Sequence, residues 1–274
     1  MSLDLNLKRN EFQAFPFHLV TPSPWPLFVS FSLLFLTIGA VMYMHGYPNG
    51  GLSLTMGLIV TIFGMSLWFK DVITEGTLLG DHTKEVKKGI TLGVILFIVS
   101  EVFAFLSVFW AYFHSSLSPT IELGGIWPPQ GITALNPFAI PLLNTLLLLS
   151  SGAFITFAHH ALIKGNRKYT IIGTTITLIL AIIFTYFQYV EYTDAGFTIS
   201  DSVYGSAFFA STGLHGFHVI VGTIFIGVAF IRFVLYQQTK HTHLNLESSI
   251  LYWHFVDVVW LFLYVVVYYW GGNN

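Results

Sequence analysis

Seven long apolar stretches dominate this sequence, and each approaches the length needed to cross a lipid bilayer as a helix. A helix that rises about 1.5 Å per residue needs about 20 apolar residues to cross a hydrocarbon layer of about 30 Å. Strands of a membrane barrel would need only about 10 residues and would alternate in polarity. The predicted spans are Trp25 to Tyr43, Leu52 to Phe69, Gly89 to Phe113, Phe138 to Ile163, Tyr169 to Val190, Tyr204 to Phe233 and Ser249 to Trp270. The sequence therefore predicts an all-α, polytopic membrane protein with seven transmembrane helices, forming a single transmembrane domain over residues 1–274.

Positive charge is sorted to one side of these spans. All 11 Lys and Arg residues fall before the first span or in the alternate connections at 70–88, 164–168 and 232–240. By the positive-inside rule the N-terminus is inside, and an odd number of crossings then places the C-terminus outside. Seven-helix receptors and retinal proteins usually have the opposite orientation, and retinal proteins also need a Lys in the last helix. No Lys follows Lys240 here, so both classes are disfavoured.

Composition narrows the chemistry further. With 54% hydrophobic and 9% charged residues, the chain has too little polar surface for a soluble globular protein of its size. A net charge of -2 gives no sign of nucleic-acid binding. Because the chain has 0 Cys, disulfides, Cys-ligated zinc and iron–sulfur clusters are excluded. A metal site would have to use His or carboxylate side chains.

The third span carries a carboxyl group near the middle of the bilayer. Glu101 lies roughly 18 Å along the helix from Gly89. An unpartnered acidic residue there costs about 2.5 to 3.5 kcal/mol, so Glu101 is expected to face protein or water, find a partner or stay protonated. It flanks a stripe of mostly small residues, which is expected to pack against another helix. Two interpretations stay open, a hydrogen-bonded packing residue and a proton-handling group. The stripe consists of Gly93, Phe97, Ser100, Ala104, Ser107 and Ala111.

The last two spans carry polar stripes that are expected to meet. One stripe holds Ser211, His215, His218 and Gly222, and the other holds His254, Asp257, Tyr264 and Tyr268. His254 and Asp257, at positions i and i+3, are expected to form a hydrogen-bonded pair inside the bundle, and His215 is expected to be a polar packing residue. The alternative is a haem or metal site. No span carries the two widely spaced His residues of a cytochrome b, and adjacent His159 and His160 point about 100° apart, so no metal site is predicted.

Residues 68–89 on the inside face mix an interfacial aromatic with charges of both signs. Trp68 at headgroup depth and Arg232, which ends the sixth span on the same side, are the residues expected to contact lipid phosphates. Solvated charges that obey the positive-inside rule explain most of the Lys residues. The acidic residues of this stretch, with His82 among them, are also a candidate surface for collecting protons. They are Asp71, Glu75, Asp81 and Glu85.

Several blocks of sequence, in order along nearly the whole chain, resemble cytochrome c oxidase subunit III of the mitochondrially encoded type. The blocks are FHLVTPSPWP, SEVFAFLSVFWAYFHSSLSP, ELGGIWPPQGI, PLLNTLLLLSSGA, FTISDSVYGSAFFASTGLHGFHVIVG and YWHFVDVVWLFLYVVVYYWG. The resemblance implies a two-helix unit at 1–70 and a five-helix unit at 71–274, separated by a V-shaped cleft filled with phospholipid. It also implies a non-redox core subunit of a respiratory terminal oxidase that passes electrons from cytochrome c to oxygen and pumps protons.

The resemblance assigns roles to residues already named. Glu101 matches an intramembrane carboxyl that reacts with carbodiimide, which implies a protonated acid in an apolar site. The residues that match the lipid cleft are Trp68, Glu75, His82, His218 and Arg232. Lys70 stands where relatives often have Arg, so it keeps the charge but lacks the planar fork that binds phosphate in two places.

The resemblance also implies partners and location. Subunit III binds no redox cofactor: haem a, haem a3, CuA and CuB belong to other subunits, and the chain itself holds structural phospholipids. Its partners are subunits I and II and accessory subunits, with cytochrome c as the substrate of the complex. The expected location is the mitochondrial inner membrane with the N-terminus in the matrix, and a bacterial inner membrane would show the same topology. A proton-coupled transporter that uses Glu101 and a purely structural scaffold are the alternative functions.

Overall fold

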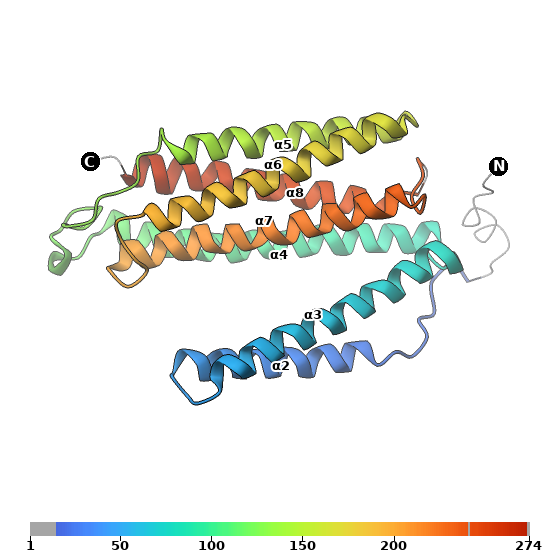
Figure 1. Ribbon diagram of the computed structural model, residues 1–274, viewed down its shortest axis with the longest axis horizontal. Helices are drawn as coiled ribbons and strands as arrows, with labels where there is room; N and C mark the ends of the chain where they lie inside the picture. Colours follow the sequence, from blue (N-terminus) through green and yellow to red (C-terminus); the bar gives the residue numbers. More distant parts are fainter. Residues whose placement is uncertain (1–14, 241, 273–274) are drawn as a thin grey trace. The chain divides into compact units, whose positions relative to one another are not determined.

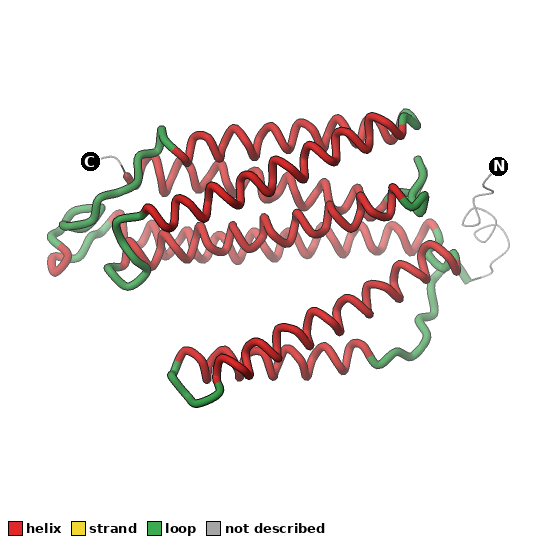
Figure 2. The backbone as a smooth tube through the Cα atoms, viewed as in Figure 1, coloured by secondary structure: helices red, strands yellow, loops and turns green. Residues whose placement is uncertain are grey.

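The computed structural model describes residues 15–240 and 242–272. The regular structure of these residues is helical, with one isolated bridge between Thr239 and Thr242. Seven helices of this described part are long and apolar enough to cross a membrane, which confirms the predicted fold class. The helices are α2 (Trp25–Met44), α3 (Gly50–Thr74), α4 (Lys84–Leu117), α5 (Ile140–Ile163), α6 (Arg167–Asp194), α7 (Val203–Val234) and α8 (Leu244–Leu263) (Figure 1). The π-helical turns η1 (Glu75–Leu79) and η3 (Tyr264–Trp270) continue α3 and α8, and a short 3-10 turn, η2 (Ile121–Leu123), lies in the loop before α5 (Figure 2). Lys8 and Arg9 fall outside the described residues.

Helix starts follow from local sequence. Pro26 and Pro141 lie in the first turns of α2 and α5, where the missing N–H of proline leaves no intrahelical bond unmade. Asn166 caps α6 through its side chain, which accepts from the backbone N–H of Tyr169, and Ser202 caps α7 in the same way. These caps lie in the short polar connections between spans.

The chain packs as two compact units, which divide between Ile90 and Thr91 inside α4. The division at residue 70 expected from sequence stays a prediction about how the helices are grouped. In the first unit, α2 and α3 pack through glycines. A Cβ atom on Gly39 would lie 2.7 Å from the backbone N of Leu54, and one on Gly57 would lie 2.7 Å from Cα of Leu36. Only glycine permits this close approach of two helix backbones.

The second unit is built around large aromatic side chains from α7, α8 and their neighbours. Trp253 and Trp260 of α8 are fully buried, and Phe184 of α6 packs edge-on against Trp260 with ring centroids 4.9 Å apart. The indole N–H groups of both tryptophans donate to hydroxyls of α5: Trp253 to Ser151 at 2.9 Å and Trp260 to Thr145 at 3.0 Å. The core is therefore apolar in bulk but has fixed polar contacts that set the register of α5 against α8.

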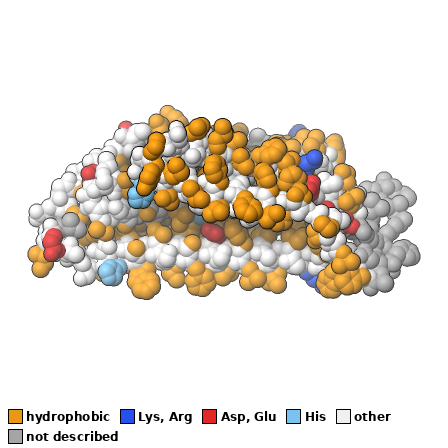
Figure 3. All heavy atoms as spheres, turned by 90° about the horizontal axis from the view of Figure 1, so that it is seen from below, with side chains coloured by type: hydrophobic (Ala, Val, Ile, Leu, Met, Phe, Trp, Pro, Cys, Tyr) orange, Lys and Arg blue, Asp and Glu red, His pale blue; other side chains and the backbone are white. Residues whose placement is uncertain are grey.

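Close packing of the small-residue stripe on α4 against another helix stays a prediction, and Phe97 of the stripe stacks on Tyr252 of α8 with ring centroids 6.4 Å apart. Within the second unit α4 buries Phe105, Phe109 and Tyr112, whereas Ser100 and Ala104 of the stripe are exposed. Lipid offers no hydrophobic driving force for this choice, so the inward face is held by the packing contacts of its rings, as between Phe109 and Phe262 with centroids 4.5 Å apart. Across the molecule many large apolar side chains remain exposed, and they cover much of the visible surface in Figure 3. Such a surface is stable in lipid rather than in water.

Candidate functional site

Glu101 of α4 meets His218 of α7 inside the second unit. The distance between Glu101 Oε2 and His218 Nε2 is 2.7 Å, and the two side chains are 23% and 6% exposed. His218 Nδ1 lies 2.8 Å from the carbonyl oxygen of Leu214, one turn earlier in α7. A carbonyl oxygen only accepts, so Nδ1 must carry a proton and donate it. The contact between Nε2 and Oε2 then holds a second proton, either on a neutral Glu101 or on a positively charged His218.

Aromatic rings pack around the His218 member of the pair. Phe105 of α4 lies 5.0 Å from the His218 ring between centroids, and Tyr252 of α8 stacks on that ring at 6.2 Å. Neither ring places a counter-charge beside the pair. In such a low-dielectric setting a short, single-proton bond is strong, and its two protonation patterns differ only in which side chain holds the proton. The contact is therefore a hydrogen bond between two ionisable side chains near the middle of a span.

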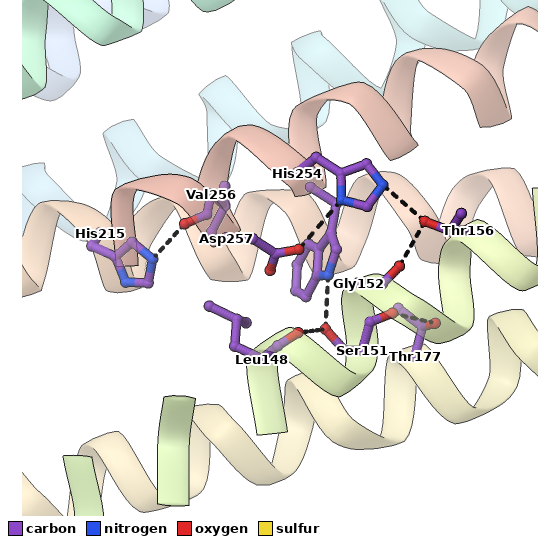
Figure 4. Close-up of polar contacts among 10 residues, drawn as sticks. Leu148, Ser151, Gly152, Thr156, Thr177, His215, His254, Val256 and Asp257 are labelled. Atoms are coloured by element: carbon purple, nitrogen blue, oxygen red, sulfur yellow. Dashed lines mark hydrogen bonds and ion pairs between the residues drawn. The ribbon is translucent and has the colours of Figure 1, made fainter. Parts of the chain in front are cut away.

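A second polar cluster joins α5 to α8 (Figure 4). His254 Nε2 lies 3.1 Å from the hydroxyl of Thr156, which itself donates to the carbonyl of Gly152, so the imidazole is the donor to Thr156. His254 Nδ1 lies 3.4 Å from Asp257 Oδ2. With Nε2 protonated, this contact again needs a proton between an imidazole nitrogen and a carboxyl oxygen. A Cβ atom on Gly152 would lie 2.4 Å from Asp257 Oδ2, so the carboxyl is seated directly against the backbone of α5.

His215, the third polar packing residue predicted from sequence, lies apart from that cluster. Its Nε2 donates to the carbonyl oxygen of Val256 at 3.2 Å, and its ring packs against Trp260 at 5.1 Å and Phe184 at 5.9 Å. The helices that carry the two polar stripes do meet. His215 nevertheless contacts backbone and rings of the neighbouring helices rather than Asp257.

The acidic stretch of the first unit makes several polar contacts within that unit. Asp71 accepts from the indole N–H of Trp25 at 2.5 Å. Asp81 lies 3.7 Å from His18, and the exposed Glu85 pairs with Lys88 at 2.9 Å. Glu75, His82 and His18 bring one ligand atom each to within 4.8 Å of one another. Trp68, by contrast, lies on the surface of α3 with 38% of its area exposed.

Arg232 lies near the end of α7 in the second unit, where its Nε donates to the side chain of Gln237 at 3.4 Å. The lipid-facing residues predicted from sequence are therefore divided between units. Trp68, Glu75 and His82 belong to the first, and His218 and Arg232 belong to the second.

Sequence patterns did not reveal two polar contacts, one buried and one at the surface end of α7. The Tyr268 hydroxyl donates to Glu191 Oε1 at 2.5 Å, and the side-chain amide of Gln188 donates to the same oxygen at 3.1 Å. Arg167 closes the end of α7 by donating to the carbonyls of Phe233 and Val234 at 2.9 Å and 2.8 Å. Gln188 and Glu191 are three residues apart in a predicted span, and that polar spacing is the signal that could have identified the first contact.

Comparison with known proteins places the sequence in one family. The sequence model of the family described as cytochrome c oxidase subunit III matches residues 15–272. Cytochrome c oxidase subunit 3 of Mycosarcoma maydis is 62% identical over 275 residues, which cover 98% of this chain and 100% of that protein. The proteins of the same name from Emericella nidulans and Prototheca wickerhamii are 61% and 57% identical, covering 96% and 94% of this chain and 98% of each relative.

Proposed function

The chain belongs to the cytochrome c oxidase subunit III family and is a core subunit of that oxidoreductase, and from this premise we propose that it supports the oxidase through bound phospholipid and proton handling. The contact between Glu101 and His218 carries the proposal, because it holds a single proton between two groups away from the charged ends of the spans. The haems and coppers of electron transfer reside in subunits I and II, while this chain stabilises subunit I. Accessory subunits complete the complex, and cytochrome c delivers the electrons.

The proposed location is the mitochondrial inner membrane. The sorting of Lys and Arg supports an N-terminus in the matrix and a C-terminus in the intermembrane space. Seven apolar helices support a multi-pass arrangement. Epitope tags at the two ends, tested for protease access in intact mitochondria and in mitoplasts, would measure the orientation.

The proposed phospholipid contacts use Trp68, Glu75, His82, His218 and Arg232. Trp68 offers an amphipathic ring at headgroup depth, and Arg232 offers a guanidinium suited to phosphate. Glu75 and His82, which lie together with His18, would contact the polar headgroup rather than acyl chains. The measurement is lipid retained per haem a in purified oxidase. We expect less retained phospholipid in W68A and R232Q oxidase, with Y43F as a control at an exposed aromatic position. Equal retention in all three variants would reject these contacts.

The proposed proton-collecting surface comprises Asp71, Glu75, Asp81, His82 and Glu85. Glu85 is the most accessible of the carboxylates with a defined partner, because it pairs with Lys88 on the surface, whereas Asp71 is held by Trp25. We expect E85Q to slow steady-state proton uptake by reconstituted oxidase and D71N to act mainly on stability. Neutralising the whole set without altering the uptake rate or its pH dependence would reject the collecting role.

The experiment that tests the central pair is infrared spectroscopy of the purified oxidase. We expect a carbonyl stretch of a protonated carboxylic acid that disappears in E101Q and shifts in H218N, where the partner changes. The band should persist in E122Q, which alters a carboxyl in the loop after α4. If no acid band is lost in E101Q, the proton resides on His218, and Glu101 is not the protonated acid that the resemblance implies.

A further inference from the structure

The end of the second unit that contains the connections from α5 to α6 and from α7 to α8 holds a cluster that the function proposed above does not involve. His159 lies near the C-terminal end of α5, His243 precedes the first turn of α8, and Glu247 lies in the first turn of α8. One ligand atom from each of the three residues lies within 4.8 Å of the other two. We propose that these side chains form a binding site for a divalent transition-metal ion of the zinc class.

Hydrogen bonding at His243 fixes the state of its ring. Nδ1 lies 3.0 Å from the carbonyl oxygen of Thr239, so Nδ1 carries a proton and donates it. Nε2 is then a lone-pair atom, and it lies 3.0 Å from Glu247 Oε1, which is also a lone-pair atom. Two acceptors at this distance repel each other unless a positive species lies between them. A second ring nitrogen that donates to a backbone carbonyl is the usual arrangement of metal-binding histidines, because it orients the ring and selects the tautomer.

His159 provides the observation that favours a metal over a proton. Its Nε2 is buried and makes no hydrogen bond, and it lies 4.0 Å from the same Glu247 Oε1. The rings of His159 and His243 are 5.8 Å apart between centroids and steeply inclined to each other. A proton between His243 and Glu247 would satisfy two atoms and leave the His159 nitrogen unpaired. A metal ion would satisfy all three.

The donor set matches the chemistry of zinc-class ions. Two imidazole nitrogens and one carboxylate are common ligands, with bonds of about 2.0 to 2.2 Å, and water completes the coordination. At such bond lengths tetrahedral ligand atoms are roughly 3.3 Å apart, so the 4.0 Å separation must shorten by less than 1 Å. Glu247 can make that movement most readily, because its side chain is 48% exposed, whereas those of His159 and His243 are 26% and 10% exposed. The exposed carboxylate also gives an ion access from water.

The neighbouring His160 is a matched control. It is exposed, and its ring stacks on His159 with centroids 6.2 Å apart, but it does not belong to the ligand set. The argument from adjacent residues, that His159 and His160 cannot chelate together, therefore holds. The partners of His159 come instead from beyond α6 and α7 in the sequence, at His243 and Glu247.

The test is equilibrium binding of ⁶⁵Zn²⁺ to the purified whole oxidase after treatment with a mild chelator. Wild type and H160Q should each bind zinc at one more exchangeable site per haem a than E247Q and H243Q do. If the two variants still bind zinc at this site, their affinity should be at least tenfold weaker than that of wild type. E247Q keeps the test decisive if H243Q fails to assemble, because it changes an exposed side chain. Equal binding by wild type, E247Q and H243Q would overturn the proposal, as would equal loss in H160Q.

Discussion

The phenol of Tyr268 donates a hydrogen bond of 2.5 Å to the buried carboxyl of Glu191, 77 residues away in sequence. Both side chains are almost fully shielded, and the other carboxyl oxygen of Glu191 has no hydrogen-bond partner. The contact therefore links the π-helical end of α8 to the end of α6 through a single polar bond.

Replacing Tyr268 by Phe should destabilise the second unit. The change removes one donor from a buried carboxyl that already lacks a partner at its second oxygen, which costs about 1 to 3 kcal/mol. The measurement is the temperature at which detergent-solubilised oxidase releases this subunit. Y269F, which alters a neighbouring exposed tyrosine, should release the subunit near the wild-type temperature. Similar release temperatures for both variants would contradict the prediction.

Replacing Gly152 by Ala should disrupt the polar cluster between α5 and α8. The new Cβ would lie 2.4 Å from Asp257 Oδ2, which is too close, and a buried carboxyl has little room to move. We expect a loss of about 1 to 3 kcal/mol, as for overpacking elsewhere. Thermal release is again the measurement. G216A, in α7 where a Cβ meets nothing within 4 Å, is the control and should be neutral or slightly stabilising.

Arg167→Lys should loosen the end of α7. Arginine donates to two terminal carbonyls at once and lies 3.6 Å above the ring of Tyr236, whereas lysine cannot match the planar fork. We expect a loss of about 1 kcal/mol and faster amide hydrogen exchange over the last turn of α7. K168R makes the reverse change at an exposed neighbour. If exchange in that turn is the same in both variants, Arg167 does not close the helix.

Glu101→Ala and Glu101→Gln should differ. Alanine leaves the buried Nε2 of His218 without a partner, at a cost of about 1 to 3 kcal/mol, whereas a glutamine amide can donate to neutral His218 in place of the acid. We expect E101Q oxidase to resemble wild type in thermal release and E101A oxidase to lose the subunit at lower temperature. Equal stability of the two variants would show that the bond to His218 contributes nothing.

Sequence reasoning predicted the helices because an apolar span in lipid must satisfy its backbone hydrogen bonds internally, and a helix does so. It placed the end of α5 at Ile163, as observed, but ended the second span at Phe69, whereas α3 and its π-helical turn continue to Leu79. Charged residues beyond the hydrocarbon do not end a helix, so hydropathy marks the apolar part of a span and not its full length. The two π-helical turns carry no sequence signal.

The sequence identified the individual residues of the candidate site, but it did not show which of them contact each other. The cost of an acid in the bilayer identified Glu101, and helical periodicity placed His218 on a polar face. Neither argument paired them, because which faces of α4 and α7 meet depends on the burial of Phe105 and its neighbours. The spacing of His243 and Glu247, one helical turn apart, was visible in sequence, whereas the approach of His159 depends on tertiary packing. Family membership favours the oxidase over the transporter considered at the outset.

The glycine contacts between α2 and α3 bear on how the chain enters a membrane. Gly39 and Gly57 let these two helices meet backbone to backbone using only residues of the first unit, across the short connection at 45–49. The pair is therefore complete as a helical hairpin before the later spans have been synthesised. During translation, α2 and α3 can therefore enter the bilayer together, as a paired hairpin, before the later spans are inserted.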